Sequence, residues 1–285
     1  MCYNPDVNTL LNICNILLSN FVKVILVDNT ENNCNINLLN IKGVKLIYLN
    51  INIGISKAQN IGIKIALQEG AEVIVFFDQD SEIENDFLVN LFSPLKPDQP
   101  MVVSPFFIDK KTGFQFPCMK LNTLGLLKTI KNQNFERPFI VDVVISSGSA
   151  ATKKTFEIAG LMNEDYFIDF VDTEWCLRCK SKGIPIYVVP TAKMLHSIGD
   201  KSIDLFFLKL FIHSPVRSYY KVRNSFLFIR NNNVPLLMGV KEIISALIHN
   251  SLIILFVKDK KTYFKNYIIA IRDGLLGRTG KRIDK

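Results

Sequence analysis

The feature that most constrains this chain is the short apolar run Val73–Phe77, which is followed at once by Asp78, Gln79 and Asp80. A run of β-branched and aromatic residues this short is typical of a buried strand in a parallel sheet. Open α/β sheets bind ligands just beyond the carboxyl ends of their strands. Two carboxylates there are unfavourable unless they hold a cation or a partner base. The pattern therefore predicts an α/β fold with a ligand or metal site at this edge.

Apolar periodicity elsewhere in the chain supports the same fold class. Strands are expected at residues 22–27, 44–49, 101–107, 141–145 and 186–189, the last extended by 192–196, and helices at 10–20, 55–70, 84–92, 154–159 and 173–183. Ser56 is the expected N-cap of the 55–70 helix, and Gly70 follows its end. Strands that alternate with helices imply right-handed crossovers and a parallel sheet. Residues 109–139 are expected to be an irregular surface excursion.

Composition allows a sizeable core, because 48% of the 285 residues are hydrophobic. The six cysteines form no recognisable disulfide framework, and Cys176 and Cys179 lack a second pair of ligands for zinc. These two cysteines are interpreted as small residues on a helix. No secretory signal precedes the first motif, so a reducing cytoplasm is the expected compartment.

Positive charge is concentrated in the last third of the chain. From Asp200 onward there are 16 Lys and Arg against 6 Asp and Glu, a net charge of +10, whereas the preceding residues carry 18 and 20, a net of −2. This difference predicts a domain at 1–199 and a basic, aromatic-rich extension at 200–285. Such a region suits nucleic acid, anionic lipid or a phosphorylated substrate. The apolar stretch 234–257 contains charged residues, so an amphipathic helix on a bilayer is favoured over a spanning helix or an ordinary packed one.

Other polar residues are expected to gather at the same sheet edge. Asp28 ends the 22–27 strand, where an acidic residue can accept hydrogen bonds from a nucleobase or ribose, although Asp-Asn is also a common turn pair. Asp172 lies in an acidic stretch, residues 164–175, and is either a helix N-cap or a general base that deprotonates a hydroxyl. His196 follows the last strand and is either structural or a metal ligand.

Together these segments resemble a known family in both order and spacing. The matching segments are Tyr3-Asn4-Pro5, Val27-Asp28-Asn29, Asn52-Ile53-Gly54-Ile55, Ala58-Gln59-Asn60-Ile61-Gly62, Phe77-Asp78-Gln79-Asp80-Ser81, Ile145-Ser146-Ser147-Gly148-Ser149, residues 167–178, His196-Ser197-Ile198-Gly199, Tyr219-Tyr220 with Arg223-Asn224, and Arg272-Asp273-Gly274. They resemble the family 2 glycosyltransferases of the GT-A fold, most closely the bacterial rhamnosyltransferases that build O-antigen and capsule chains. The resemblance covers nearly the whole chain.

The resemblance implies a GT-A fold: an α/β, Rossmann-like, mixed and mostly parallel sheet flanked by helices, with a C-terminal helical extension. It also implies a divalent cation, Mg²⁺ or Mn²⁺. The residues that it implies for donor binding are Tyr3 and Asp28 at the nucleobase, Lys57 and Asn60 beside the nucleotide, and Asp78 and Asp80 at the ribose and the metal-bound diphosphate. Asp80 and His196 are implied at the metal, and Asp172 as the catalytic base. Arg178 is expected either to be structural or to balance the acidic stretch.

The implied activity is an inverting transfer of rhamnose from dTDP-L-rhamnose to a lipid-linked oligosaccharide in cell-surface polysaccharide biosynthesis. The enzyme is expected to lie on the cytoplasmic face of the membrane and to bind no nucleic acid. One departure concerns the first strand, which in the family precedes the Tyr-Asn-Pro, whereas here only Met1 and Cys2 precede Tyr3. The start is therefore internal or the first strand is truncated, and an upstream extension is expected to raise thermal stability.

Alternative functions remain open at this point. One is a family 2 glycosyltransferase that uses a UDP-sugar. Another is a nucleotidyltransferase or a nucleotide-sugar-binding module with a similar sheet, although no Gly- and Lys-rich phosphate-binding loop lies between Tyr3 and Leu10. A nucleic-acid binder is disfavoured because the carboxylate clusters would repel phosphate in the absence of metal.

Overall fold

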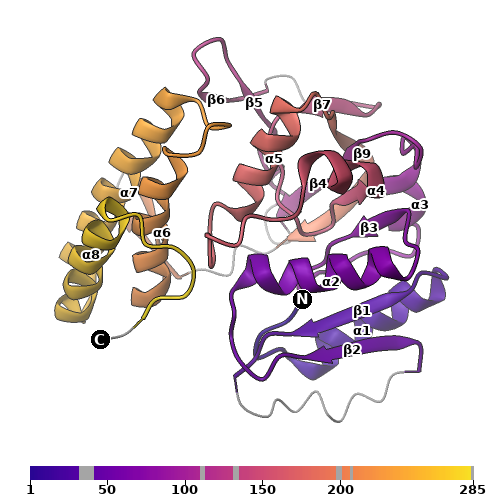
Figure 1. The fold of residues 1–285 in the computed structure, drawn as a ribbon, viewed down its shortest axis with the longest axis horizontal. Coiled ribbons are helices and arrows are strands. Elements are labelled where there is room, and N and C mark those ends of the chain that lie inside the picture. The colour runs from indigo at the N-terminus through magenta and orange to yellow at the C-terminus, as the bar shows by residue number, and fades with distance from the viewer. Residues whose placement is uncertain (32–41, 110–112, 131–134, 197–200, 206–207, 284–285) are drawn as a thin grey trace.

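The computed structural model describes residues 1–31, 42–109, 113–130, 135–196, 201–205 and 208–283. Helices and strands are arranged in two regions (Figure 1). One contains the sheets, and the other, called the helical layer below, consists of the three long helices α6, α7 and α8 beside it. The expected boundary between residues 199 and 200, the motif residues Ser197, Ile198 and Gly199, and Phe206 and Phe207 lie outside the described residues. The division of the chain into two domains therefore stays a prediction.

The helices mostly begin and end within a few residues of their expected positions. They are α1 (Val7–Ser19), α2 (Ile55–Gln68), α3 (Phe87–Phe92), α4 (Lys153–Ala159), α5 (Val171–Ser181), α6 (Pro215–Phe228), α7 (Leu236–Phe256) and α8 (Lys260–Leu275). The expectation that Ser56 caps α2 is wrong. Gly54 is the N-cap, with a φ of 89°, and Ser56 lies inside the first turn, where its hydroxyl donates to the carbonyl of Tyr166.

The strands are β1 (Val24–Asp28), β2 (Val44–Tyr48), β3 (Val73–Val75), β4 (Val102–Asp109), β5 (Met119–Leu121), β6 (Leu127–Thr129), β7 (Phe139–Val141), β8 (Ala150–Thr152), β9 (Ile186–His196), β10 (Lys201–Leu205) and β11 (Leu208–Ile212). The expected extension of the last strand to residues 192–196 is confirmed by β9. Two antiparallel hairpins were not predicted: β5–β6, inside the supposedly irregular 109–139 segment, and β10–β11, which precedes the helical layer.

The central sheet has five strands in the order β3-β8-β4-β9-β7. β3, β4 and β9 run in one direction, whereas β7 and β8 are reversed. The sheet is thus mixed with a parallel majority, as expected. The expectation that the strand at 73–77 is fully buried and pairs in parallel is wrong, because β3 pairs antiparallel with β8 and its side chains are only partly buried.

An apolar cavity explains why β3 is incompletely buried. β1 and β2 form a separate parallel pair, and a cavity of about 520 Å³ lies between β1 and β3. At one end of it, the N–H of Cys2 donates to the carbonyl of Val27, and Cys2 forms a parallel bridge with Asp28. The first residues of the chain thereby connect the end of β1 to the segment that follows β3.

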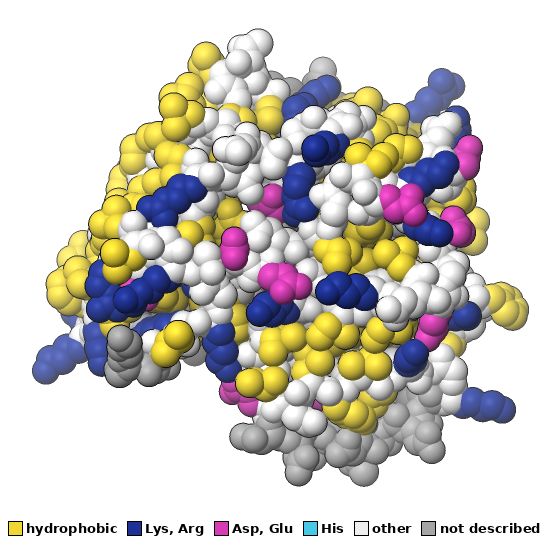
Figure 2. Space-filling view, viewed as in Figure 1, with side chains coloured by type: hydrophobic (Ala, Val, Ile, Leu, Met, Phe, Trp, Pro, Cys, Tyr) yellow, Lys and Arg dark blue, Asp and Glu magenta, His cyan; other side chains and the backbone are white. Residues whose placement is uncertain are grey.

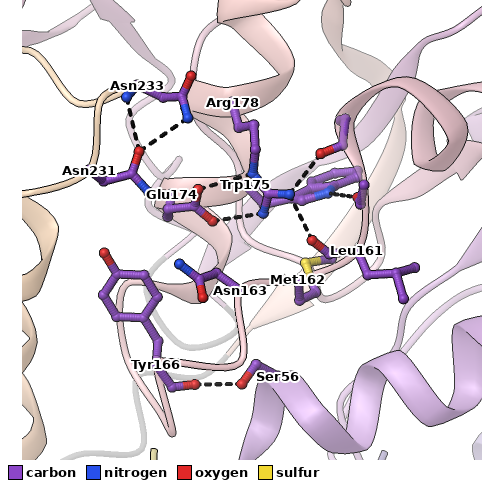
Figure 3. Close-up of polar contacts among 12 residues, drawn as sticks. Ser56, Leu161, Met162, Asn163, Tyr166, Glu174, Trp175, Arg178, Asn231 and Asn233 are labelled. Atoms are coloured by element: carbon purple, nitrogen blue, oxygen red, sulfur yellow. Dashed lines mark hydrogen bonds and ion pairs between the residues drawn. The ribbon is translucent and has the colours of Figure 1, made fainter. Parts of the chain in front are cut away.

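Buried polar contacts fix α5 on the segment that precedes it. Glu174 is 1% exposed and accepts two hydrogen bonds from Arg178, at 3.0 and 2.8 Å, while Asn231 donates a third (Figure 3). Arg178 also donates to the carbonyls of Ala159 and Leu161. Arg178 is therefore structural and also balances one buried acid. Cys176 and Cys179 are free and buried on α5, as the sequence predicted.

We predict that Glu174→Ala lowers the free energy of unfolding by about 3–5 kcal/mol, because it leaves a largely buried guanidinium without its carboxylate. Chemical denaturation monitored by circular dichroism measures this loss. Glu69→Ala is the matched control, because Glu69 forms an ion pair with Lys45 on the surface, where such pairs contribute about 1 kcal/mol or less. Equal losses in the two variants would contradict the prediction.

Candidate functional site

The carboxylates after β3 lie in a turn that the residues before β8 support. The N–H of Asp78 and the hydroxyl of Ser81 both contact the hydroxyl of Ser147, at 3.3 and 3.1 Å. Gly148 has a φ of 70°, and a Cβ there would lie 2.5 Å from the sulfur of Met194. Glycine at this position therefore lets the 146–149 segment pack closely against β4 and β9. Asp78 is partly buried, and Asp80 is exposed.

Asp28 lies at the end of β1, on the other side of the N-terminal residues. Its carboxylate is 3% exposed and accepts a hydrogen bond from the N–H of Thr30 at 3.0 Å. The backbone of Tyr3 donates to the side chain of Gln79 at 2.7 Å, and the Tyr3 ring is 41% exposed. The segment from Cys2 to Tyr3 therefore joins Asp28 to the 78–80 turn. The expectation of a single sheet edge is wrong, because β1 and β3 belong to separate sheets.

The end of β9 reaches the same edge. Leu195 forms an antiparallel bridge with Glu82, two residues beyond Asp80, and His196 pairs with Asp109 across β4 and β9. The backbone of His196 is thus close to the carboxylate turn. Its side chain lies outside the described residues, so its role as a metal ligand stays a prediction.

Asp172 is the second residue of α5 and is not its N-cap, which is Phe170. Its carboxylate lines a cavity of about 10 Å³, enough for one water at most, together with Phe76, Ser146 and Trp175. Burial raises the pKa of Asp172 to about 6, hydrogen bonds from Ser146 oppose the shift, and the negative charges of Asp78 and Asp169 add to it. A carboxylate with this pKa is suited to act as a general base near neutral pH.

Asn60 and Lys57 extend from α2 toward the segment that precedes α5. The Asn60 amide is 2% exposed and forms 2.9 Å hydrogen bonds with both backbone groups of Met162 and with Glu164. Lys57 is half-exposed and lies 4.0 Å from Glu164. Lys57 can therefore turn toward a ligand, whereas Asn60 would have to exchange existing hydrogen bonds. Direct donor contacts of both residues stay predictions.

The residues present fit a divalent cation that a diphosphate helps to hold. Within the described part of the chain, no three His, Cys, Asp or Glu side chains come together as a metal cluster. Asp78 and Asp80 supply hard carboxylate oxygens, and Mg²⁺ or Mn²⁺ usually needs only one or two of these when substrate phosphates complete the shell. The donor set is thus of the kind expected for a shared protein–phosphate site.

Sequence reasoning missed the serines that connect these carboxylates. Ser146 bonds to Asp172 and accepts a hydrogen bond from Gln59 at 3.1 Å, and Ser147 supports the 78–80 turn. In the sequence this small, hydroxyl-bearing segment stood out only as one of the segments that carry the family resemblance. Its position after an expected strand was the available signal, but the pairing of β8 with β3, which brings the serines to the turn, was not visible in the sequence.

A mixed sheet with a carboxylate turn after β3 and a further carboxylate at the start of α5 is the arrangement expected of GT-A glycosyltransferases that use nucleotide sugars. The Glycosyl transferase family 2 model matches residues 2–157, more than half of the chain. The chain belongs to this family and is a glycosyltransferase.

Two curated relatives extend the match toward the C-terminus. The dTDP-rhamnosyl transferase RfbF of Shigella flexneri is 44% identical over 279 residues, covering 98% of this chain and 94% of the relative. The low-salt glycan biosynthesis hexosyltransferase Agl10 of Haloferax volcanii is 24% identical over 243 residues, covering 81% and 75%. The first of these similarities spans both the sheet-containing region and the helical layer.

Solved structures agree on the fold. The TarS 1–349 fragment of S. aureus, in complex with UDP-GlcNAc, superposes with a TM-score of 0.56 at 16% identity, over 97% of this chain and 79% of that one. GalNAc-T7 with UDP, GalNAc and Mn²⁺ gives a TM-score of 0.55 at 14% identity, over 95% and 56%. At such low identity the likeness establishes the GT-A fold alone.

We predict that transfer activity falls as the pH drops through about 6, because protonation of Asp172 would remove the candidate base. The pH dependence of kcat checks this. Asp172→Asn is expected to lower kcat by roughly 10²–10⁴-fold. A variant that keeps full activity would exclude Asp172 as the base.

Asp172→Asn is also expected to raise the melting temperature at pH 7.5. The folded-state pKa lies above the ordinary value, so the folded protein holds a proton more tightly than the unfolded chain does, and stability falls as pH rises from about 4 to about 6. The neutral amide removes this penalty. The difference in melting temperature from the unmodified protein should therefore be largest above pH 6 and vanish near pH 4.

Proposed function

We propose that this glycosyltransferase transfers rhamnose from dTDP-L-rhamnose, with inversion, to a lipid-linked oligosaccharide in cell-surface polysaccharide biosynthesis. The observation that carries the proposal is the 44% identity to a dTDP-rhamnosyl transferase over 98% of the chain. Because that match covers nearly the whole chain, a shared donor is the simplest account. A UDP-sugar donor is the alternative, since a structural neighbour at much lower identity binds UDP-GlcNAc.

In the proposed reaction the acceptor hydroxyl attacks the anomeric carbon while its proton passes to the carboxylate of Asp172. The bond from that carbon to the diphosphate breaks, and its electron pair leaves with dTDP. Asp28 and Tyr3 hold the nucleoside, and Asp78 binds the ribose. Asp80 and His196 would hold a divalent cation, which would supply positive charge to neutralise the departing diphosphate.

A donor panel tests the proposal most directly. We expect hydrolysis of dTDP-L-rhamnose in preference to other dTDP-, UDP- and GDP-sugars, loss of turnover with EDTA, and recovery with Mg²⁺ or Mn²⁺. Asp80→Ala should lower turnover by roughly 100-fold or more. Asp86→Ala, a change of the same kind at an exposed carboxylate in the loop before α3, is the control and should be neutral.

Two outcomes of the panel would contradict different parts of the proposal. Preference for a UDP-sugar would replace the proposed donor while leaving the site intact. Undiminished turnover in Asp80→Ala, or in EDTA, would exclude the proposed divalent cation site at Asp80.

We further propose that the helical layer rests on an anionic membrane. α7 is, by length and composition, the one helix in the described part of the chain that is able to cross a bilayer, and it packs here against α6 and α8. Its outer face is an exposed apolar stripe with helical spacing: Leu237, Val240, Ile244, Ile248 and Leu255. Figure 2 shows hydrophobic side chains gathered along this outer edge of the molecule.

Positive charge near this apolar face favours anionic lipid as its partner. Lys258, which follows α7, and Lys260, Lys261 and Lys265 of α8 are exposed, and so are the α8 residues Phe264 and Ile268. Apolar side chains beside lysines suit a helix that lies in the headgroup region of anionic lipid. A membrane position also brings the site close to a lipid-linked acceptor.

Vesicle flotation tests this surface. We expect binding to vesicles of phosphatidylglycerol and phosphatidylethanolamine that weakens with salt, and at least about tenfold weaker binding for the double variant Ile244→Asp, Ile248→Asp. Val89→Asp is the control, because Val89 is 71% exposed but lies on α3. Equal binding by both variants would exclude the α7 stripe as the membrane surface.

A further inference from the structure

The loop before α5 carries a carboxylate that the transfer step itself does not require. Asp169 lies three residues before Asp172, and both Asp169 and Phe170 have a φ of 64°. Residues other than glycine rarely adopt this left-handed region, and such strain clusters at functional sites, where the surrounding structure holds it in place.

Two elements hold the loop in this conformation. From α2, the N–H of Ile55 donates to the carbonyl of Phe167 at 2.7 Å. From α6, the side-chain amide of Asn224 donates to the carbonyl of Ile168 at 2.7 Å. Asn224 is fully buried, so this bond is shielded from water. The position of Asp169 is therefore fixed by the packing around it.

Only one oxygen of the Asp169 carboxylate has a partner. Oδ1 accepts hydrogen bonds from Arg217 at 3.1 Å and 3.3 Å. Oδ2 is buried and has no hydrogen-bond partner. A buried carboxylate oxygen without a donor is costly, so its presence in a strained loop points to a donor that arrives with a ligand.

The unpaired oxygen belongs to the surroundings of the candidate base. The negative charge of Asp169 contributes to the raised pKa of Asp172, so the two carboxylates lie close enough to interact. Arg217 comes from α6, so Asp169 also marks the place where the helical layer meets the site. A ligand beside Asp172 that carries hydrogen-bond donors is a sugar, whose hydroxyls suit a carboxylate oxygen.

We propose that Oδ2 of Asp169 binds a sugar hydroxyl, with Arg217 fixing the orientation of the carboxylate. The inference rests on the proposed function. The acceptor sugar is favoured over the transferred sugar, because Asp172 receives its proton from an acceptor hydroxyl and the helical layer faces the proposed membrane side. Asp169 is then a binding residue, and Arg217 is a positioning residue.

Asp169→Asn is the informative variant. Asparagine tolerates the left-handed conformation and has nearly the same shape. Arg217 keeps the amide oxygen on its own side, so the NH₂ group takes the place of Oδ2 and an acceptor becomes a donor. Asp165→Asn is the matched control, because Asp165 is an exposed carboxylate on the same loop.

Three measurements separate the possibilities. They are hydrolysis of dTDP-L-rhamnose without acceptor, calorimetric affinities for dTDP-L-rhamnose and dTDP, and rhamnose transfer to a lipid extract of cells that lack this enzyme. For an acceptor site, Asp169→Asn should raise the KM for the extract at least about tenfold and leave hydrolysis and both affinities unchanged. For a transferred-sugar site, the affinity for dTDP-L-rhamnose should fall by a similar factor while that for dTDP stays constant.

Either result supports a hydroxyl site, and the two results identify its source. Wild-type values of Asp169→Asn in all three measurements would overturn the proposal. So would a fall in dTDP affinity together with a lower melting temperature, which would indicate a structural role. If the unmodified protein does not bind dTDP-L-rhamnose, the proposed donor fails instead, and the same comparison is made with the sugar nucleotide that the protein does hydrolyse.

Discussion

The geometry of the candidate site depends on the left-handed turn at Asp169 and Phe170. This turn sets the direction in which α5 begins and hence the position of Asp172. Two consecutive non-glycine residues in this conformation are unfavourable on their own. They are held because α2 and α6 both bond to the carbonyls of the loop, and because the Phe170 ring packs on Phe228 at 4.8 Å. Contacts from both the sheet-containing region and the helical layer thus offset the cost of the left-handed turn next to Asp172.

The helical layer is consequently part of the site's scaffold. Arg223 is 1% exposed and donates to the carbonyls of Gly280 and, at longer distance, Asp165. The ring of Tyr220 stacks on Phe167 with 4.7 Å between centroids. A guanidinium buried this way serves internal carbonyls and takes no part in binding an external anion. Arg223 therefore serves the interior of the fold, whereas Lys258 and the α8 residues Lys260, Lys261 and Lys265 are exposed on the surface.

Much of the fold was predictable from local pattern. The periods of the apolar residues identified α1 to α5 and the strands β1 to β4 and β9, because these depend on residue type and near neighbours. The strand expected at 141–145 was wrong, since β7 ends at Val141, and the single sheet edge expected for Asp28, Asp78 and Asp80 was wrong, since β1 and β3 belong to separate sheets. The antiparallel entry of β8 next to β3 was not predictable. Strand partners are chosen by contacts between residues far apart in the chain, such as Val75 with Ala150, and these leave no local signal.

The same contrast applies to the site. The sequence by itself determined which carboxylates are available, that two of them follow a strand, and that Asp172 begins a helix, because these facts depend on residue type and near neighbours. Only the tertiary structure decided the burial, the hydrogen-bond partners and the pKa of each group. The raised pKa of Asp172, the occupied amide of Asn60 and the unpaired oxygen of Asp169 all arise from burial against distant segments, and desolvation is a property of the packed fold.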